Sequence, residues 1–137
     1  MNYAELRKHP ADFEVCYRFF SREEGGRVSG PPFQHYRCDW AYDGDDTGKT
    51  GVYMIHPEFL AEDGSIQPKG VAVPRSGKAT MWILSPEMRS KFHCARIRPD
   101  VRGFFMEGSR RVAEAVVSRI MGLHTNPKSK SDADTAV

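Results

Sequence analysis

Short stretches in which apolar and polar residues alternate recur along the chain, and glycine and proline separate them. The clearest stretch covers residues 14–20, where Val15, Tyr17 and Phe19 occupy every second position. A period of two is typical of a strand with one buried face. Further strands are predicted at 33–42, 51–55, 78–84, 91–97 and 103–107.

Residues 111–121 fit two structures. One set of apolar residues, beginning at Val112, recurs at helical spacing, and another, beginning at Ala113, occupies every second position. Periodicity leaves a helix and a strand equally open here. The rest of the pattern is that of an all-β protein.

The two ends of the chain differ from this pattern. Asn2 followed by Glu5 predicts a capped helix of one or two turns, which Pro10 ends. We therefore expect an N-terminal extension (1–12) and a β domain (13–122). Residues 123–137, almost without apolar side chains from Asn126 onward, are expected to form a disordered tail. The polar connection at 61–77 is expected to be exposed, and the pattern does not say whether it folds over the domain.

With 137 residues the chain is long enough for one domain and one core. Twenty basic and eighteen acidic residues give a net charge of +2, which is not the charge of a polyanion-binding protein. The first residues lack a basic segment followed by an apolar one, and no apolar run approaches membrane-spanning length. We therefore expect a cytoplasmic protein with no membrane partner.

Cysteine and histidine are too scattered to predict a metal site. The chain has three cysteines, Cys16, Cys38 and Cys94, and no Cys-x-x-Cys motif. An odd number of widely spaced cysteines argues against a disulfide framework and a zinc site. On a strand, His93 and Cys94 would point to opposite faces. We expect the cysteines to fill core positions and the histidines to lie on the surface. A nucleophile formed by Cys38 or Cys94 with a histidine stays open as an alternative.

Nucleotide binding is not predicted either. The phosphate-binding glycine patterns are missing, and Gly25-Gly26 is typical of a turn. The aromatic stretch at 33–42 could stack bases, but acidic residues surround it and would repel phosphate, which favours a core role. No cofactor, metal or nucleotide is therefore expected.

Two motifs resemble a known family. Residues 23–27 (Glu-Glu-Gly-Gly-Arg), followed by Pro32-Phe33 and Tyr36-Arg37, resemble the stretch that opens the C-terminal β-barrel, the third domain, of bacterial elongation factor Tu. Residues 106–112 resemble a later glycine-containing motif of that domain, and 80–86 its strand ending in a proline turn. The resemblance spans 13–122. The GTPase domain and the second barrel of the factor have no counterpart here.

The resemblance implies a small closed antiparallel β-barrel in which 111–121 is the closing strand. In the elongation factor this domain contacts the GTPase domain and the T-stem of aminoacyl-tRNA, and two of the tRNA-side positions match Glu107 and Gly108. Asp39 stands where the family has a glutamine, and the turn that follows carries Asp43, Asp45 and Asp46. This acidic edge disfavours tRNA binding.

Together, these observations predict a non-catalytic module that binds a protein partner and has no GTPase activity. Three alternatives remain: an immunity or decoy protein against a toxin that targets or uses elongation factor Tu, a tRNA-binding module, and the cysteine enzyme. The predicted binding surface consists of Arg22, Glu23, Glu24, Arg27, Asp39, Asp43, Asp45, Asp46, Glu107, Gly108, Arg110 and Arg111.

Overall fold

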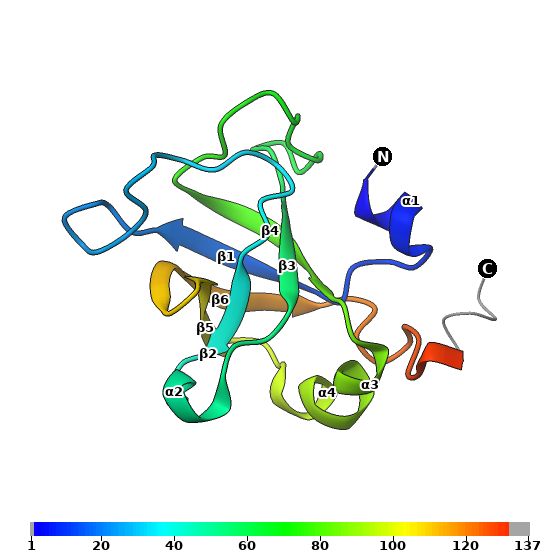
Figure 1. Cartoon of the computed structure of the whole chain (residues 1–137). Helices are drawn as coiled ribbons and strands as arrows, with labels where there is room; N and C mark the ends of the chain where they lie inside the picture. The colour runs from blue at the N-terminus through cyan, green and yellow to red at the C-terminus, as the bar shows by residue number, and fades with distance from the viewer. Residues whose placement is uncertain (1, 132–137) are drawn as a thin grey trace.

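In the computed structural model, residues 2–131 are described, and within them six strands form one antiparallel sheet (Figure 1). The strand order is β2-β5-β6-β1-β4-β3, and the sheet curls strongly into a half-barrel. The protein is therefore mainly β, with short helices around the sheet, which confirms the predicted fold class at this level.

The strands are β1 (Phe13–Phe19), β2 (Asp39–Tyr42), β3 (Ile55–Phe59), β4 (Ser76–Ile83), β5 (Arg102–Glu107) and β6 (Arg110–Ile120). The helical segments are α1 (Tyr3–Arg7), α2 (Thr47–Thr50), α3 (Pro86–Met88), the π-helical turn η1 (Arg89–His93) and α4 (Cys94–Arg96).

Strand β1 shows the predicted alternation. Val15, Tyr17 and Phe19 are buried, whereas Cys16 between them is exposed. The strand lies between β4 and β6 in the middle of the sheet. Inward-facing side chains from all six strands pack together inside the curl, where Phe105 of β5 lies against Tyr17.

The ambiguous segment at 111–121 is a strand. β6 pairs with β1 on one side and with β5 on the other, so both of its edges are hydrogen-bonded within the sheet. Ala113, Ala115 and Val117 face the core. The helical spacing that begins at Val112 is a coincidence of the sequence, since pairing on both edges requires an extended backbone.

The second predicted strand is much shorter than its aromatic pattern indicated. Strand β2 has only four residues, because the chain before it turns and His35 takes a left-handed φ of 67°. The third predicted strand is displaced, since β3 begins at Ile55 and Tyr53 forms an isolated bridge to Trp40. The two edges of the sheet meet at this bridge, with N···O distances of 2.8 Å in both directions. The sheet is thus a half-barrel whose two edges are linked by this bridge. The prediction was a closed barrel, in which the edge strands would pair along their length.

The prediction of a strand at 91–97 is wrong. Residues 86–96 form consecutive helical turns below the half-barrel (Figure 1). Ser85 caps them by accepting the N–H of Met88 at 3.2 Å, and Pro86 occupies the first helical position. Serine followed by proline and glutamate is a helix-start signal that the alternation pattern concealed. No helix in residues 2–131 has the length and apolar character needed to cross a bilayer.

The N-terminal helix forms where it was predicted. Asn2 caps α1 and makes a capping box with Glu5. Tyr3 attaches the helix to the sheet: its N–H donates to the buried carboxylate of Glu58 at 3.0 Å, and its ring stacks on His35 with centroids 4.6 Å apart. The N-terminal extension therefore packs on the half-barrel.

The connection at 61–77 folds over the upper end of the half-barrel (Figure 1). Gln34 is buried at this end and hydrogen-bonds both the end of β3 and the connection. Its amide nitrogen donates to the carbonyls of Phe59 and Gln67 at 2.8 and 2.9 Å, and its Oε1 accepts the N–H of Phe59 at 2.8 Å. Ala72 adds a β-bridge to Phe33. This end of the core is therefore covered.

The segment after β6 begins with buried residues, although a tail was predicted from residue 123. Leu123 and Asn126 are 2% and 3% exposed, and Leu123 belongs to the core. The ordered part of the chain thus extends past the predicted boundary. Residues 132–137 of the predicted tail lie outside the described residues.

Candidate binding surface

The loop after β1, residues 21–32, begins with a tight turn that needs two glycines. The N–H groups of Glu24 and Gly26 donate to the carbonyl of Ser21 at 3.1 and 2.9 Å. Gly25 has a φ of +92°, whereas a Cβ on Gly26 would lie 2.2 Å from the carbonyl oxygen of Phe20. The predicted turn is confirmed, and the two glycines are required for different reasons: backbone conformation and close approach.

Replacing Gly26 with alanine is expected to displace this loop. The methyl group would overlap backbone atoms that cannot rotate away, so the free energy of unfolding should fall by about 1–3 kcal/mol. Urea denaturation measures the change. Gly70→Ala is the matched control, because a Cβ at Gly70 meets no atom within 4 Å. Equal effects of the two substitutions would contradict the close approach.

Side-chain hydrogen bonds join this loop to the turn between β5 and β6, and Tyr36, which follows the loop, adds another to the same turn. Arg27 and Tyr36 both donate to the carboxylate of Glu107, and the Arg27 guanidinium lies over the Tyr36 ring, 4.6 Å from its centroid. Arg110 donates to the carbonyl of Gly26 at 3.1 Å. Burial, and then the hydrogen bond to Glu107, raise the pKa of Tyr36, so its hydroxyl keeps its proton. We call the loop 21–32 and the turn 107–111 together the rim.

Glu24 of the rim is the centre of a charged cluster that extends onto the outer face of the sheet. Arg18 and Arg75 contact its carboxylate at 3.1 and 3.0 Å, and Arg18 also reaches Glu114 on β6 at 3.1 Å. The hydrogen bond from Arg18 lowers the pKa of Glu24 to about 2. Exposed ion pairs add little stability. Their effect here is to orient the loop.

A pocket of about 340 Å³ lies at the base of the loop, and we call it the loop pocket. Its walls come from the end of β1, from the loop itself and from the chain just before β4. Most of the lining is apolar, and three arginines, Ser21 and Gly30 complete it. The apolar residues are Phe19, Phe20, Val28, Pro31, Pro32 and Val73.

The predicted binding residues fall into two separate groups. Asp43 belongs to an acidic turn at 43–48, and its N–H donates to the carbonyl of Arg102, where β5 begins. Glu107 of the rim stands where β5 ends. The acidic turn and the rim therefore lie at opposite ends of one strand, whereas Asp39, paired with Met106, lies near the rim. Arg22, Glu23, Glu24, Arg27, Glu107, Gly108, Arg110 and Arg111 belong to the rim.

The acidic turn has structural contacts of its own. Asp45 accepts two hydrogen bonds from Arg96 of α4, at 2.9 and 3.1 Å, and the Arg96 guanidinium lies 3.8 Å from the centroid of the Tyr42 ring. Asp46 caps α2 through the N–H of Gly48 at 3.0 Å. Asp45 thus links the acidic turn to α4, whereas Asp46 only caps its own short helix. On β6, Arg111 lies over the ring of Phe104 at 4.1 Å.

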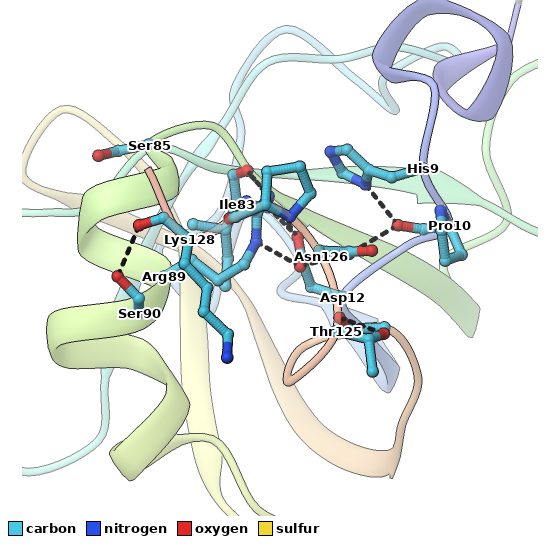
Figure 2. Close-up of polar contacts among 12 residues, drawn as sticks. His9, Pro10, Asp12, Ile83, Ser85, Arg89, Ser90, Thr125, Asn126 and Lys128 are labelled. Atoms are coloured by element: carbon cyan, nitrogen blue, oxygen red, sulfur yellow. Dashed lines mark hydrogen bonds and ion pairs between the residues drawn. The ribbon is translucent and has the colours of Figure 1, made fainter. Parts of the chain in front are cut away.

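A buried polar network links the N-terminal segment, the helical turns and the C-terminal segment (Figure 2). Arg89 donates to the two carboxylate oxygens of Asp12 at 2.7 and 3.4 Å, and both side chains are almost fully buried. Asp12 also accepts the N–H of Ile83 at 2.7 Å and the amide of Asn126 at 2.8 Å. Arg89 further donates to the carbonyls of Ile83 and Pro127, each at 2.7 Å.

Sequence reasoning did not find this network. Arg89 and Asn126 lie 77 and 114 residues from Asp12 along the chain, so no local spacing relates them. Its bonds are satisfied within the protein, and its members are covered. The network therefore has a structural role, holding three segments of the chain together.

His93, which we expected on the surface, is buried beneath the helical turns. Its Nδ1 and the hydroxyl of Tyr42 are 2.6 Å apart. Burial, assisted by the positive charges of Arg96 and Arg89, lowers the pKa of His93 to about 4. The imidazole is therefore neutral at pH 7 and serves as a hydrogen-bonding core residue.

The cysteines occupy three different environments. Cys38 is buried as predicted, whereas Cys16 is exposed because it lies on the outer face of β1, and the Cys94 thiol donates to the carbonyl of Ser90 at 2.9 Å. Burial raises the pKa of Cys38 well above its usual range, which opposes formation of the nucleophilic thiolate. Among the described residues, no group of three or more His, Cys, Asp or Glu side chains could hold a metal ion.

Compared with known proteins, the chain matches no protein-family model and no curated protein.

Proposed function

We propose that this protein is a non-catalytic binding module, related to the third domain of elongation factor Tu, that uses the rim to bind a protein partner. The observation that carries the proposal is the attachment of two loops to each other by side-chain bonds, from Arg27 and Tyr36 to Glu107 and from Arg110 to Gly26. Loops held rigidly on a scaffold are the usual places of recognition.

The state of the polar groups in the rim, and of Tyr36 beside it, supports binding over chemistry. Glu107 accepts from two donors at once, and Tyr36 keeps its proton because burial raises its pKa. Groups engaged in this way fix a shape and are poorly suited to move protons. An ordered rim also loses little conformational entropy when a partner binds.

The relation to the elongation-factor domain is supported by the arrangement of the strands. The resemblance implies a closed antiparallel barrel with residues 111–121 as its closing strand. The strongly curled antiparallel sheet and the strand β6 agree with its coarse features, whereas β6 lies inside the sheet, between β5 and β1. The two motifs that carry the resemblance also meet in the structure, where Arg27 of residues 23–27 donates to Glu107. These points favour the family without identifying a partner.

Affinity capture with the tagged full-length chain, from a lysate of the organism that encodes it, tests the proposal. We expect one protein in stoichiometric amount, and about tenfold less of it with Arg110→Glu, because a charge reversal in the rim repels a complementary surface. Arg98→Glu is the matched control, since Arg98 is exposed and lies outside the rim.

Two results would overturn this function. Equal capture by both variants would place the partner elsewhere on the molecule. Recovery of tRNA in place of a protein would favour the RNA-binding alternative, and sequencing of the co-purified RNA detects it. If the captured protein is a toxin, the immunity role follows.

A further inference from the structure

The loop pocket combines apolar walls with an excess of positive charge. Its lining includes Arg22, Arg27 and Arg75 and, among the described residues, no aspartate or glutamate. Its volume of about 340 Å³ is at the lower end of the range for ligand sites, which suits a side chain or two of a peptide. An apolar group with a negative charge beside it matches this lining.

The three arginines differ in how far they are already engaged. Arg27 is held by Glu107 and by the carbonyl of Gly30 at 2.8 Å. Arg75 donates through Nε to the carbonyl of Phe19 at 3.2 Å and shares Glu24 with Arg18, but its side chain is 62% exposed. Arg22 is exposed and has no ion pair within the described part of the chain. Arg22 can therefore pair with a carboxylate from outside, and Arg75 can do so through its exposed Nη atoms while its Nε keeps the bond to Phe19.

Exposed apolar side chains continue the pocket outward. Val28 in its wall is 61% exposed, and Phe33 and Val71 nearby are 54% and 52% exposed. The bridge between Phe33 and Ala72 keeps the last two in adjacent segments. Clustered apolar exposure beside a pocket is typical of an interaction surface.

We propose that the loop pocket binds a peptide segment of a partner protein in which an apolar side chain is flanked by aspartate or glutamate. The apolar side chain enters between Phe20 and Val28, and the acidic side chains pair with Arg22 and Arg75. Guanidinium groups pair with carboxylates through two parallel hydrogen bonds, which favours acidic residues over other polar ones. This inference rests on the proposed function and names the kind of partner that it requires.

Selection of random displayed peptides on the immobilised full-length chain tests the inference. We expect enriched peptides to carry Leu, Ile, Met or Phe next to Asp or Glu. Synthetic copies with amidated C-termini should bind in fluorescence anisotropy, and their binding should weaken as salt is raised, because exposed ion pairs are screened.

Variants then place the peptide on the protein. Arg22→Glu and Val28→Asp should each weaken binding about tenfold, the first by charge repulsion and the second by putting a charge in the apolar wall. The matched controls are Arg98→Glu, an exposed arginine outside the pocket, and Met54→Asp, with the same 61% exposure as Val28. Both controls should bind like the wild type. Thermal unfolding shows that each variant is folded.

The inference is overturned if no peptide is enriched, if enriched peptides lack acidic residues, if amidation abolishes binding, or if the controls weaken binding as much as the pocket variants. These results are separable from a failure of the proposed function. A captured protein that is lost with Arg110→Glu but kept with Arg22→Glu would leave the rim as the binding surface and reject the pocket. Peptide binding at the pocket without a captured protein would keep the peptide site and reject the expected stoichiometric protein partner.

Discussion

Replacing Arg89 with methionine is expected to lower the free energy of unfolding by about 3–5 kcal/mol. The guanidinium is the cationic partner of Asp12, which is fully buried, and it also binds two backbone carbonyls. Methionine fills part of the volume but leaves the carboxylate charged in the interior or forces it to bind a proton. Guanidinium chloride denaturation at pH 7 measures the loss.

A surface arginine provides the matched control. Arg119 contacts Glu14 at 3.3 Å, but its side chain is 63% exposed, so Arg119→Met should cost less than about 1 kcal/mol. The double variant Asp12→Asn/Arg89→Met should be more stable than the sum of the two single effects predicts, because the partners are removed together. If Arg89→Met and Arg119→Met cost the same, the buried pair does not have the role assigned to it.

The second large effect is a loss of stability on acidification, through His93. In the unfolded chain this imidazole binds a proton near its ordinary pKa of 6.5, but in the folded protein only near 4, because burial penalises the charged form. The unfolded state therefore holds more protons between these values. The stability linked to His93 is fully present above pH 6.5, falls as the pH drops, and is lost by about pH 4. The total is about 3 kcal/mol.

Denaturant unfolding measured between pH 7 and pH 4, for the wild type and His93→Gln, isolates this contribution. Glutamine can still hydrogen-bond Tyr42 but does not titrate, so the slope of stability against pH should be shallower by nearly one proton in this window. His124→Gln, at an exposed position, should keep the wild-type slope. A wild-type slope in His93→Gln would mean that the imidazole is not held neutral.

The local sequence pattern correctly predicted those elements whose signals lie within a few neighbouring residues. The alternation around Tyr17 predicted β1, and Asn2 with Glu5 predicted the start of α1. The local pattern gave wrong predictions where it fitted two structures or where neighbouring residues and distant contacts favoured another one. Residues 91–97 alternate weakly, but Ser85 and Pro86 start a helix just before them. Aromatic residues at 33–38 look like a strand, yet they turn beneath the connection that Gln34 holds.

The candidate surface was predicted in part. The motif around Gly25 marked the loop, and Glu107 marked the β5–β6 turn, since both are readable from sequence. The contact between them through Arg27 could not be predicted from local sequence, because Arg27 and Glu107 lie 80 residues apart. For the same reason the acidic turn was grouped with the rim, although the length of β5 separates them.

The sequence by itself determined the mainly β character of this protein, the period-two faces of its central strands, its capped first helix and the glycine turn that begins the rim. These depend on backbone conformation and on which face of a strand is apolar, and both are encoded by neighbouring residues. Only the tertiary structure decided which strands β6 pairs with, that the sheet curls into a half-barrel, that Asp12 meets Arg89, and that a pocket with arginines opens beside the loop. Those features depend on contacts between segments that are distant in the sequence, and the free energy of such contacts cannot be inferred from neighbouring residues.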